Sequence, residues 1–219
     1  MPTSNELCRA VFCHEHQHPD TVWRLQRFRK RLFVDTLGWQ LPVSGEIERD
    51  QFDNGAAVHC ALFVGEILVG GFRAIRTDCD YLAKRVFPQL ATTRPYPSSH
   101  LKWEISRFGV EPGRRNLELA RINYSLMFRF AQTRQATGLV AIADLTYERY
   151  LAKLDIRTRR YGPPQVIGSD RFGRPIQVVA GEIPLAHQSG PKFNALLHIA
   201  NQVTIDDQAL VFGRIRVSA

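Results

Sequence analysis

The segment LKWEISRFGVEPGRRNLELARINYSLMFRFAQT, residues 101–133, indicates the fold class of the chain. Residues 101–110 predict a strand, Glu111-Pro112-Gly113 a turn, and residues 116–133 a strongly apolar helix. The free backbone N–H groups in the first turn of such a helix can bind a phosphate group. Because every α/β fold contains helix N-termini, this segment indicates a fold class and, by itself, no activity.

The flanking segments continue the alternation of strands and helices. Residues 57–64 and 67–76 predict paired strands around a Gly65-Glu66 turn, and a helix is predicted from Asp20 and Thr21 to near Gly38. The other expected elements are strands at 6–13, 139–144, 174–185 and 209–217, helices at 146–153 (capped by Thr146) and 193–203, a polar loop at 40–54 and an irregular stretch at 78–99. This pattern predicts an α/β sandwich with a mixed sheet, and residues 1–219 are expected to form one domain.

Length and composition exclude several classes of protein. The 219 residues are 44% hydrophobic and 23% charged, as is ordinary for a globular chain. No run of about 20 apolar residues exists, so no membrane span is expected. Residues 1–9 lack the basic and apolar regions of a secretory signal, which predicts a cytoplasmic protein. We expect a monomer.

The cysteines and histidines near the N-terminus raise the question of a metal. Cys13, His14, His16 and His18 form a local cluster, but no second ligand pair stands at zinc spacing elsewhere. A polar loop after a first strand explains the cluster without a metal. We therefore predict no metal site and free cysteine thiols.

The formal net charge of +8 favours an acidic partner. Nucleic acid, an acidic carrier protein and a phosphorylated cofactor all fit, and charge alone does not choose between them. No zinc finger or aromatic RNA-binding pattern is present, so we expect no nucleic-acid partner.

Four short motifs follow one another at a specific spacing. They are RKRLFVDTLGW at 29–39, ERDQFD at 48–53, Gly70-Gly71-Phe72-Arg73, and WEISRF at 103–108. Their order closely resembles the LuxI family of acyl-homoserine lactone synthases, most clearly over roughly the first 110 residues. The pattern of that family is an Arg, a Phe and an LGW Trp, a D-x-[FY]-D box, an Arg that ends a glycine-containing strand, and an E-x-[ST]-R-F box.

The same residues also have plain structural explanations. Phe33 and Trp39 could be core aromatics, and Asp50 and Asp53 could be turn formers, while Arg29 could belong to a solvated helix face. The E-x-S-R-F box adds a geometric condition. Glu104 and Arg107 are three residues apart, so in a regular strand they face opposite sides, and a shared site requires a bulge or a splayed strand.

The resemblance implies a GNAT-like three-layer α/β/α sandwich with a mixed, splayed central sheet. It also implies S-adenosylmethionine as a substrate, in a site made of Arg29, Phe33, Trp39, Asp50, Asp53 and Arg73. The residue types suit this ligand, because carboxylates hold cationic groups, aromatic rings attract a sulfonium and arginines clamp a carboxylate. No separate cofactor is expected, since S-adenosylmethionine and the acyl thioester are both consumed.

The resemblance assigns the chemistry to the last of the four motifs. Glu104 and Arg107 are the expected catalytic residues, with Glu104 as the base that deprotonates the attacking amine. Backbone N–H groups near residues 108–110 are expected to stabilise the oxyanion. Arg114, Arg115 and Asn116 stand where GNAT enzymes carry a glycine-rich loop, which argues against tight acetyl-CoA binding in the standard manner.

The acyl donor in the resembling family is an acylated carrier protein or an acyl-CoA. A basic run could dock an acidic carrier, although such runs are usually solvated helix faces; its residues are Arg149, Lys153, Arg157, Arg159 and Arg160. The expected acyl pocket consists of Ser106, Phe108 and Ala141. Family members that prefer 3-oxo chains tend to carry a threonine at the Ala141 position, so an unsubstituted, branched or aromatic chain is predicted.

Two other functions remain open from the sequence. A GNAT-like N-acyltransferase that acylates a different amine, such as an amino acid, would share the thioester chemistry. The Arg29, Phe33, Trp39, Asp50 and Asp53 set discriminates against it, because that set serves S-adenosylmethionine. A basic nucleic-acid-binding protein rests on charge alone.

Overall fold

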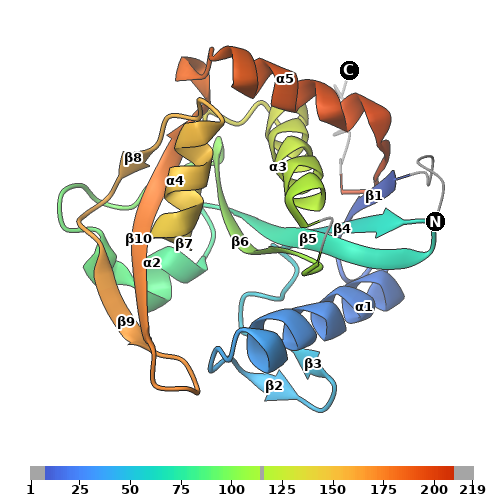
Figure 1. Ribbon diagram of the computed structural model, residues 1–219, viewed down its shortest axis with the longest axis horizontal. Coiled ribbons are helices and arrows are strands. Elements are labelled where there is room, and N and C mark those ends of the chain that lie inside the picture. Colours follow the sequence, from blue (N-terminus) through green and yellow to red (C-terminus); the bar gives the residue numbers. More distant parts are fainter. Residues whose placement is uncertain (1–7, 114–115, 210–219) are drawn as a thin grey trace, which may run out of the picture.

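The computed structural model describes residues 8–113 and 116–209 and consists of a twisted sheet with helices on both faces (Figure 1). The strands are β1 (Cys8–Cys13), β2 (Val43–Ser44), β3 (Ile47–Glu48), β4 (Val58–Val64), β5 (Ile67–Arg76), β6 (Lys102–Val110), β7 (Gly138–Asp144), β8 (Arg159–Arg160), β9 (Gln165–Ser169), β10 (Pro175–Pro184) and β11 (Thr204–Asp207). The helices are α1 (Pro19–Arg29), η1 (Lys30–Thr36), α2 (Leu82–Val86), η2 (Pro88–Leu90), α3 (Asn116–Thr133), α4 (Leu145–Lys153), η3 (Leu185–His187), α5 (Pro191–Ile199) and η4 (Ala200–Gln202).

The sheet runs in the order β11-β1-β4-β5-β6-β7-β10-β8, and β9 pairs with β10 beside this path. β1 with β11 and β6 with β7 are parallel pairs, whereas the other pairs are antiparallel. Figure 1 shows α3, α4 and α5 on one face of the sheet and α1 with the small β2–β3 sheet on the other. The predicted three-layer α/β/α sandwich with a mixed sheet is confirmed.

Helices pack on both faces of the sheet through their apolar side chains. On α3, Leu119, Ile122, Leu126 and Phe130 recur at helical spacing and are buried against the sheet, so the helix is held by its apolar stripe. α1 buries Val22, Leu25 and Phe28 on the opposite face.

The sheet splays open between β6 and β7. The two strands pair with each other only from Lys102–Gly138 to Glu104–Val140. Both continue beyond that point, but no longer pair with each other. β7 is buried over its first three residues and partly exposed over Ala141–Asp144. The predicted splay is therefore confirmed, and it leaves an edge of β6 without a strand partner.

β6 also contains a bulge, the second of the two arrangements that could bring Glu104 and Arg107 to one site. Gly71 pairs with Gly109 and Arg73 pairs with Ser106, so β6 has one residue more than β5 over this interval. Arg107 absorbs the extra residue with a φ of 54°, a left-handed conformation that is uncommon outside glycine. The bulge places the side chains of Ser106 and Arg107 in one polar cluster.

Several local expectations were incomplete. The helix expected up to Gly38 changes at Lys30 into the π-helix η1, a form that is frequent at functional sites. The expected loop 40–54 contains β2 and β3, and the irregular stretch 78–99 contains α2 and η2. These elements are two to five residues long, too short for a periodic signal.

The C-terminal third differs from expectation in four details. Asp144, not Thr146, caps α4, because its carboxylate accepts from two backbone N–H groups of the first turn. The short polar strands β8 and β9 were not predicted. The helix expected over 193–203 is α5 followed directly by the 3-10 helix η4, and β11 comes after them. The strand expected at 209–217 lies outside the described residues, except for Ala209. Arg114 and Arg115, which stand where a glycine-rich loop was considered, also lie outside them.

Candidate active site

Six buried charged side chains form the centre of the site. Arg29 donates to Glu48 at 2.6 Å and, through both terminal nitrogens, to Asp53 at 2.8 Å. Arg73 donates to Asp50 at 2.5 and 3.1 Å and lies 3.0 Å from Asp53. The cluster thus joins α1, the 48–53 segment and β5.

Arg107 completes the cluster from β6. Its terminal nitrogen donates to Glu48 at 2.8 Å and to Asp50 at 2.7 Å. Three guanidinium groups therefore face three carboxylates, and the charges balance. Arg29, Arg73 and Asp53 are almost completely buried, whereas Asp50 and Arg107 keep some exposed surface. A polar ligand would meet these last two groups first.

The arginines determine the ionisation of the carboxylates. Burial alone would raise the pKa of Asp53, but the hydrogen bonds and charge of Arg29, together with the charge of Arg73, hold it well below its usual range. The pKa of Asp50 is likewise lowered, because Arg73 and Arg107 outweigh its burial. Both carboxylates are anionic at neutral pH, so the cluster is a fixed array of charges.

Glu104 lies beside this array but belongs to no ion pair within it. It is 1% exposed, and its two oxygens accept from the backbone N–H groups of Leu82 and Ala83 at 3.0 and 2.6 Å. Burial raises the pKa of Glu104 to about 7, and the backbone bonds and the charges of Arg73 and Arg107 offset this only in part. Glu104 can therefore gain or lose a proton near neutral pH, as a general base must.

A pair of aromatic side chains packs against β6. The rings of Phe33 and Trp39 are stacked, with centroids 5.2 Å apart and planes at 15°. Phe33 packs on Gly109 of β6, where an added Cβ would come within 3.1 Å of the ring. Trp39 is only half-buried, and its backbone N–H donates to the Phe33 carbonyl at 2.9 Å. Phe33 of η1 and Trp39, which follows η1, thus form a stack at the C-terminal part of β6.

The splay exposes backbone donors on β6. The N–H of Glu111 donates to Val69 of β5 at 2.7 Å. Because N–H groups alternate in direction along a strand, those of Phe108 and Val110 point away from β5, to the side from which β7 has diverged. Donors in this position suit an oxyanion.

The predicted acyl residues lie around the same opening. The Phe108 ring packs on Tyr124 with centroids 4.4 Å apart, and Tyr124 contacts Tyr150 of α4 at 5.7 Å. Ala141 pairs with Gly181 of β10, so neither strand carries a large side chain there. The acyl wall, which these residues form, thus has aromatic side chains on the helix side and small ones on the sheet side. Ser106 accepts from Arg73 at 3.1 Å and so belongs to the charged cluster as well.

Comparison with known proteins identifies the family. The sequence profile of the family described as "Autoinducer synthase" matches residues 14–182. The chain belongs to the autoinducer synthase family. An acyl-homoserine-lactone synthase of Ralstonia nicotianae is 32% identical over 161 residues, which cover 69% of this chain and 77% of the relative. One from Aeromonas hydrophila is 28% identical over 159 residues, 70% of this chain and 77% of the relative.

Solved structures share the fold of this chain. A CoA-dependent acyl-homoserine lactone synthase, BjaI, with SAM and isopentyl-CoA superposes with a TM-score of 0.78 at 21% identity, covering 91% of this chain and 93% of that chain. TofI in a ternary complex with an inhibitor and MTA gives 0.70 at 28% identity, covering 86% and 99%. The N-acyl amino acid synthase FeeM shares the fold at 0.57 and 13% identity, covering 84% and 95%. This autoinducer synthase is an acyltransferase.

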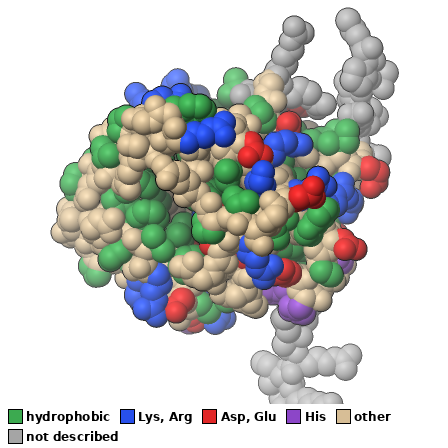
Figure 2. Space-filling model, turned by 90° about the horizontal axis from the view of Figure 1, so that it is seen from below, with side chains coloured by type: hydrophobic (Ala, Val, Ile, Leu, Met, Phe, Trp, Pro, Cys, Tyr) green, Lys and Arg blue, Asp and Glu red, His purple; other side chains and the backbone are tan. Residues whose placement is uncertain are grey.

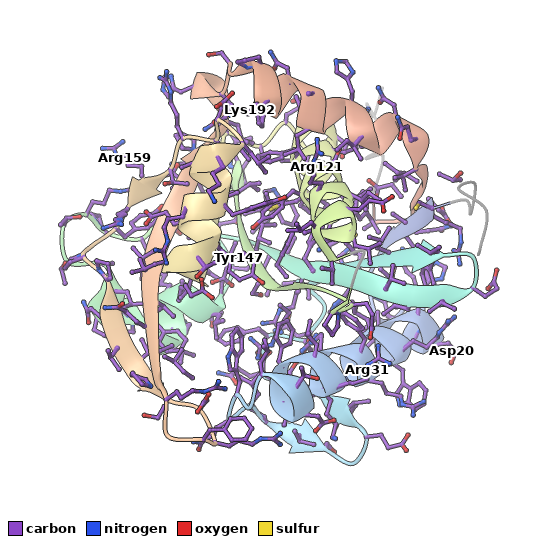
Figure 3. All side chains as sticks on the ribbon, viewed as in Figure 1. Asp20, Arg31, Arg121, Tyr147, Arg159 and Lys192 are labelled. Atoms are coloured by element: carbon purple, nitrogen blue, oxygen red, sulfur yellow. The ribbon has the colours of Figure 1, made fainter. Side chains whose placement is uncertain are left out.

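The basic residues of the predicted carrier surface lie apart from the charged cluster. Arg149, Lys153, Arg157 and Arg159 are exposed on α4 and at the β8 edge, and Figure 3 shows Arg159 projecting outward. Arg160 is also exposed but pairs with Glu148 at 2.6 Å. On the face of the synthase that is seen from below in Figure 2, basic and acidic side chains are interspersed. Whether the basic surface docks a carrier stays a prediction.

Two buried residues of the site were not singled out from the sequence. Glu48 bridges Arg29 and Arg107, and the E-R-D-Q-F-D motif contained the signal, because two aspartates cannot neutralise three arginines. His59 of β4 is fully buried beside Asp53, and neither ring nitrogen has a hydrogen-bond partner among the described residues. Burial lowers the pKa of His59 to about 3, so the ring is neutral.

The described residues, 8–113 and 116–209, contain no group of three or more His, Cys, Asp or Glu side chains that could hold a metal ion. His14 contacts the Ala57 carbonyl at 2.8 Å and stacks on His16. No helix of this part of the chain is long and apolar enough to cross a membrane.

Proposed function

We propose that this autoinducer synthase transfers an acyl group from a thioester to the amine of S-adenosylmethionine and then closes the lactone ring with release of methylthioadenosine. The observation that carries the proposal is Glu104, a buried carboxylate with a pKa near 7, which lies close to Arg73 and Arg107 at the last position of β6 that pairs with β7. The names of the curated relatives and the SAM and MTA of related structures support it.

S-adenosylmethionine fits the partly exposed groups of the site. The Trp39 face can pack on the adenosine and attract the sulfonium, a contact worth roughly 0.5–2 kcal/mol. Asp50 can pair with the ammonium and Arg107 with the carboxylate. Arg29, Asp53 and Arg73 are too buried to meet the ligand first. We assign them the task of holding Asp50 and Arg107 in a single geometry.

In the first step the amine attacks the thioester carbonyl carbon. Glu104 takes a proton from the ammonium, directly or through a water, so that the nitrogen lone pair becomes available. The tetrahedral oxyanion accepts from the N–H groups of Phe108 and Val110 on the open edge of β6. When the C–S bond breaks, its electron pair leaves with the thiolate, the nitrogen gives up its second proton, which protonates the thiolate, and the amide remains.

In the second step the carboxylate attacks its own γ-carbon. The C–S⁺ bond breaks, the electron pair goes to sulfur, and methylthioadenosine leaves. A sulfonium is a good leaving group, so this step requires positioning more than acid or base help. We assign Arg107 the task of orienting the carboxylate for this attack.

The acyl donor, the cellular location and the oligomeric state are part of the proposal as well. Both acyl-CoA and acylated carrier protein satisfy the chemistry, and BjaI is CoA-dependent by its description. We expect the synthase to act as a monomer in the cytoplasm, where both classes of substrate are made. No cofactor beyond these substrates is required by the proposed steps.

An N-acyltransferase of another amine is the alternative. FeeM has the same fold and is an N-acyl amino acid synthase, but 13% identity supports no more than the fold. The Phe33–Trp39 stack favours S-adenosylmethionine, because a simple amino acid has no adenosine or sulfonium to occupy it.

The deciding experiment incubates the purified chain with S-adenosylmethionine and a panel of acyl-CoA and acylated carrier-protein donors. Methylthioadenosine and an acyl-homoserine lactone should appear in equal amounts. Release of free thiol with an amino acid in place of S-adenosylmethionine, and no methylthioadenosine with any donor, would favour the alternative.

A further inference from the structure

The turn that joins β9 to β10, residues 169–173, contacts the segment that carries Trp39. β10 pairs with β7 along seven positions and so belongs to the acyl wall. Trp39 belongs to the opposite half of the site, after η1. Figure 1 shows the β9–β10 hairpin reaching across to the end of the α1 and η1 helix. A contact at this place bridges the two sides of the splayed sheet.

Hydrogen bonds hold the residues on both sides of Trp39. The backbone N–H of Arg171 donates to the carbonyl of Gly38 at 2.8 Å. The Gln40 side chain donates to the Ser169 carbonyl at 3.2 Å. The Arg171 guanidinium also donates to the Asp35 carbonyl, at the end of η1, at 2.6 Å. Trp39 is thus bracketed by neighbours that the β9–β10 turn fixes.

The packing at Gly38 is close. Gly38 has a φ of +74°, and an added Cβ would lie 3.0 Å from both the Arg171 side chain and the Phe172 ring. A glycine is required by the backbone conformation, and its lack of a side chain admits the turn. Phe172 is itself 59% exposed, so its position is not explained by burial in a core.

The turn is rigid enough to act as a support. The Asp170 carboxylate accepts from the backbone N–H groups of Phe172 and Arg174 at 2.9 Å and from the Arg174 side chain at 2.7 Å. These bonds fix the loop in one conformation before it meets Gly38.

We propose that the β9–β10 turn positions Trp39 for S-adenosylmethionine from the acyl side of the molecule, with Arg171 as the principal positioning residue. The inference rests on the proposed function, because it assigns Trp39 to S-adenosylmethionine. It goes further than that function, because it makes the S-adenosylmethionine site depend on the β9–β10 hairpin. The β10 strand of this hairpin also forms part of the acyl wall.

The first test is Arg171→Ala, read by steady-state kinetics of methylthioadenosine release. Loss of the bond to Asp35 should raise the KM for S-adenosylmethionine about three- to tenfold, as expected for one hydrogen bond, with kcat and the donor KM nearly unchanged. Arg171→Lys should restore most of the affinity, since an ammonium can donate to the same carbonyl. Arg24→Ala is the matched control, because Arg24 is an exposed arginine in the middle of α1 that likewise donates to a backbone carbonyl, that of Glu66, at 2.6 Å.

The second test is a double-mutant cycle with Trp39→Ala. If the turn acts through Trp39, Arg171→Ala should not raise the KM further in the Trp39→Ala background. An equal rise in both backgrounds, or no rise in the native one, overturns the proposal. Thermal unfolding of each variant checks the fold. If Arg171→Ala does not fold, Gln40→Ala carries the same cycle, and a KM unchanged in the native background overturns it equally.

The failure of this inference and that of the proposed function are distinguishable. A native chain that releases no methylthioadenosine refutes the proposed function before any variant is made. If the native chain is active and the substitutions at the turn leave the KM for S-adenosylmethionine unchanged, only the positioning role is refuted.

Discussion

On the α1 side of the opening, six charged side chains are buried and paired with one another, whereas the wall formed by β7 and α4 carries small and aromatic side chains that are partly exposed. Fixed charges in a buried array can accept only a ligand of matching charge and orientation. An apolar wall discriminates by shape, and a methylene more or less changes binding by only about 1–3 kcal/mol.

This contrast explains why the residues of the charged side indicate one ligand, S-adenosylmethionine, whereas those of the apolar side leave the acyl chain and its carrier open. Changes on the charged side should abolish turnover or folding. Changes on the apolar side should alter the choice among donors.

The largest effect is expected at Glu104. Glu104→Gln removes the base, and turnover should fall by roughly 10²–10⁴-fold. The amide cannot accept from both Leu82 and Ala83, so some stability should be lost as well. Glu182→Gln is a matched control, since Glu182 is also buried and accepts from Lys102 and Arg94. It should lose stability but retain turnover, and native-like turnover of Glu104→Gln would exclude the base.

The pH profile tests the same residue without a mutation. Glu104 must be ionised to accept a proton, so kcat/KM should rise with pH and level off above about 7. The folded pKa is higher than the ordinary value of 4.5, so the folded state binds the proton more tightly. The corresponding stability is full at low pH and is lost between about 4.5 and 7. A pH-independent kcat/KM between 5 and 8 would contradict this.

Glu104 also shows what the sequence could and could not predict. The E-x-S-R-F box predicted a bulge or a splayed strand, and both are present: Arg107 takes up one residue of β6 that is extra against β5, and β6 diverges from β7 beyond Glu104. The partners of Glu104 in α2 were not predictable, since five residues in a proline- and threonine-rich stretch carry no helical period. The pKa of Glu104 follows from burial, which three-dimensional packing alone determines.

The second effect concerns stability. Glu48→Gln removes one of three anions from the buried cluster and leaves Arg29 and Arg107 undercompensated, which should cost about 3–5 kcal/mol of unfolding free energy. Asp78→Asn is the control, because Asp78 pairs with Arg76 at 3.0 Å on the surface and should cost no more than about 1 kcal/mol. Urea unfolding measures both. Equal losses would show that the cluster is not a special source of stability.

The third effect moves to the apolar wall. Ala141 offers no hydroxyl, so a buried 3-oxo oxygen would lack a donor there, and an unmet acceptor costs about 1–3 kcal/mol, or one to two decades in selectivity. An unsubstituted donor should therefore win a competition against a 3-oxo donor of equal length. Ala141→Thr should shift the preference toward the 3-oxo donor, because Gly181 opposite leaves room for the larger side chain. A native preference for the 3-oxo donor would show that another group, such as Ser106, binds the oxygen.

The smallest effect concerns the basic surface, where charges are exposed and screened. Arg157 and Arg159 are the informative pair, since Arg160 is already bound to Glu148. Reversal of both to Glu should lower kcat/KM for acylated carrier protein several-fold, more at low salt, while acyl-CoA turnover changes less. Arg24→Glu with Arg27→Glu on α1 changes the net charge equally and controls for long-range attraction. If both double variants behave alike at every salt concentration, the carrier does not dock at β8, and coenzyme A becomes the favoured form of the donor.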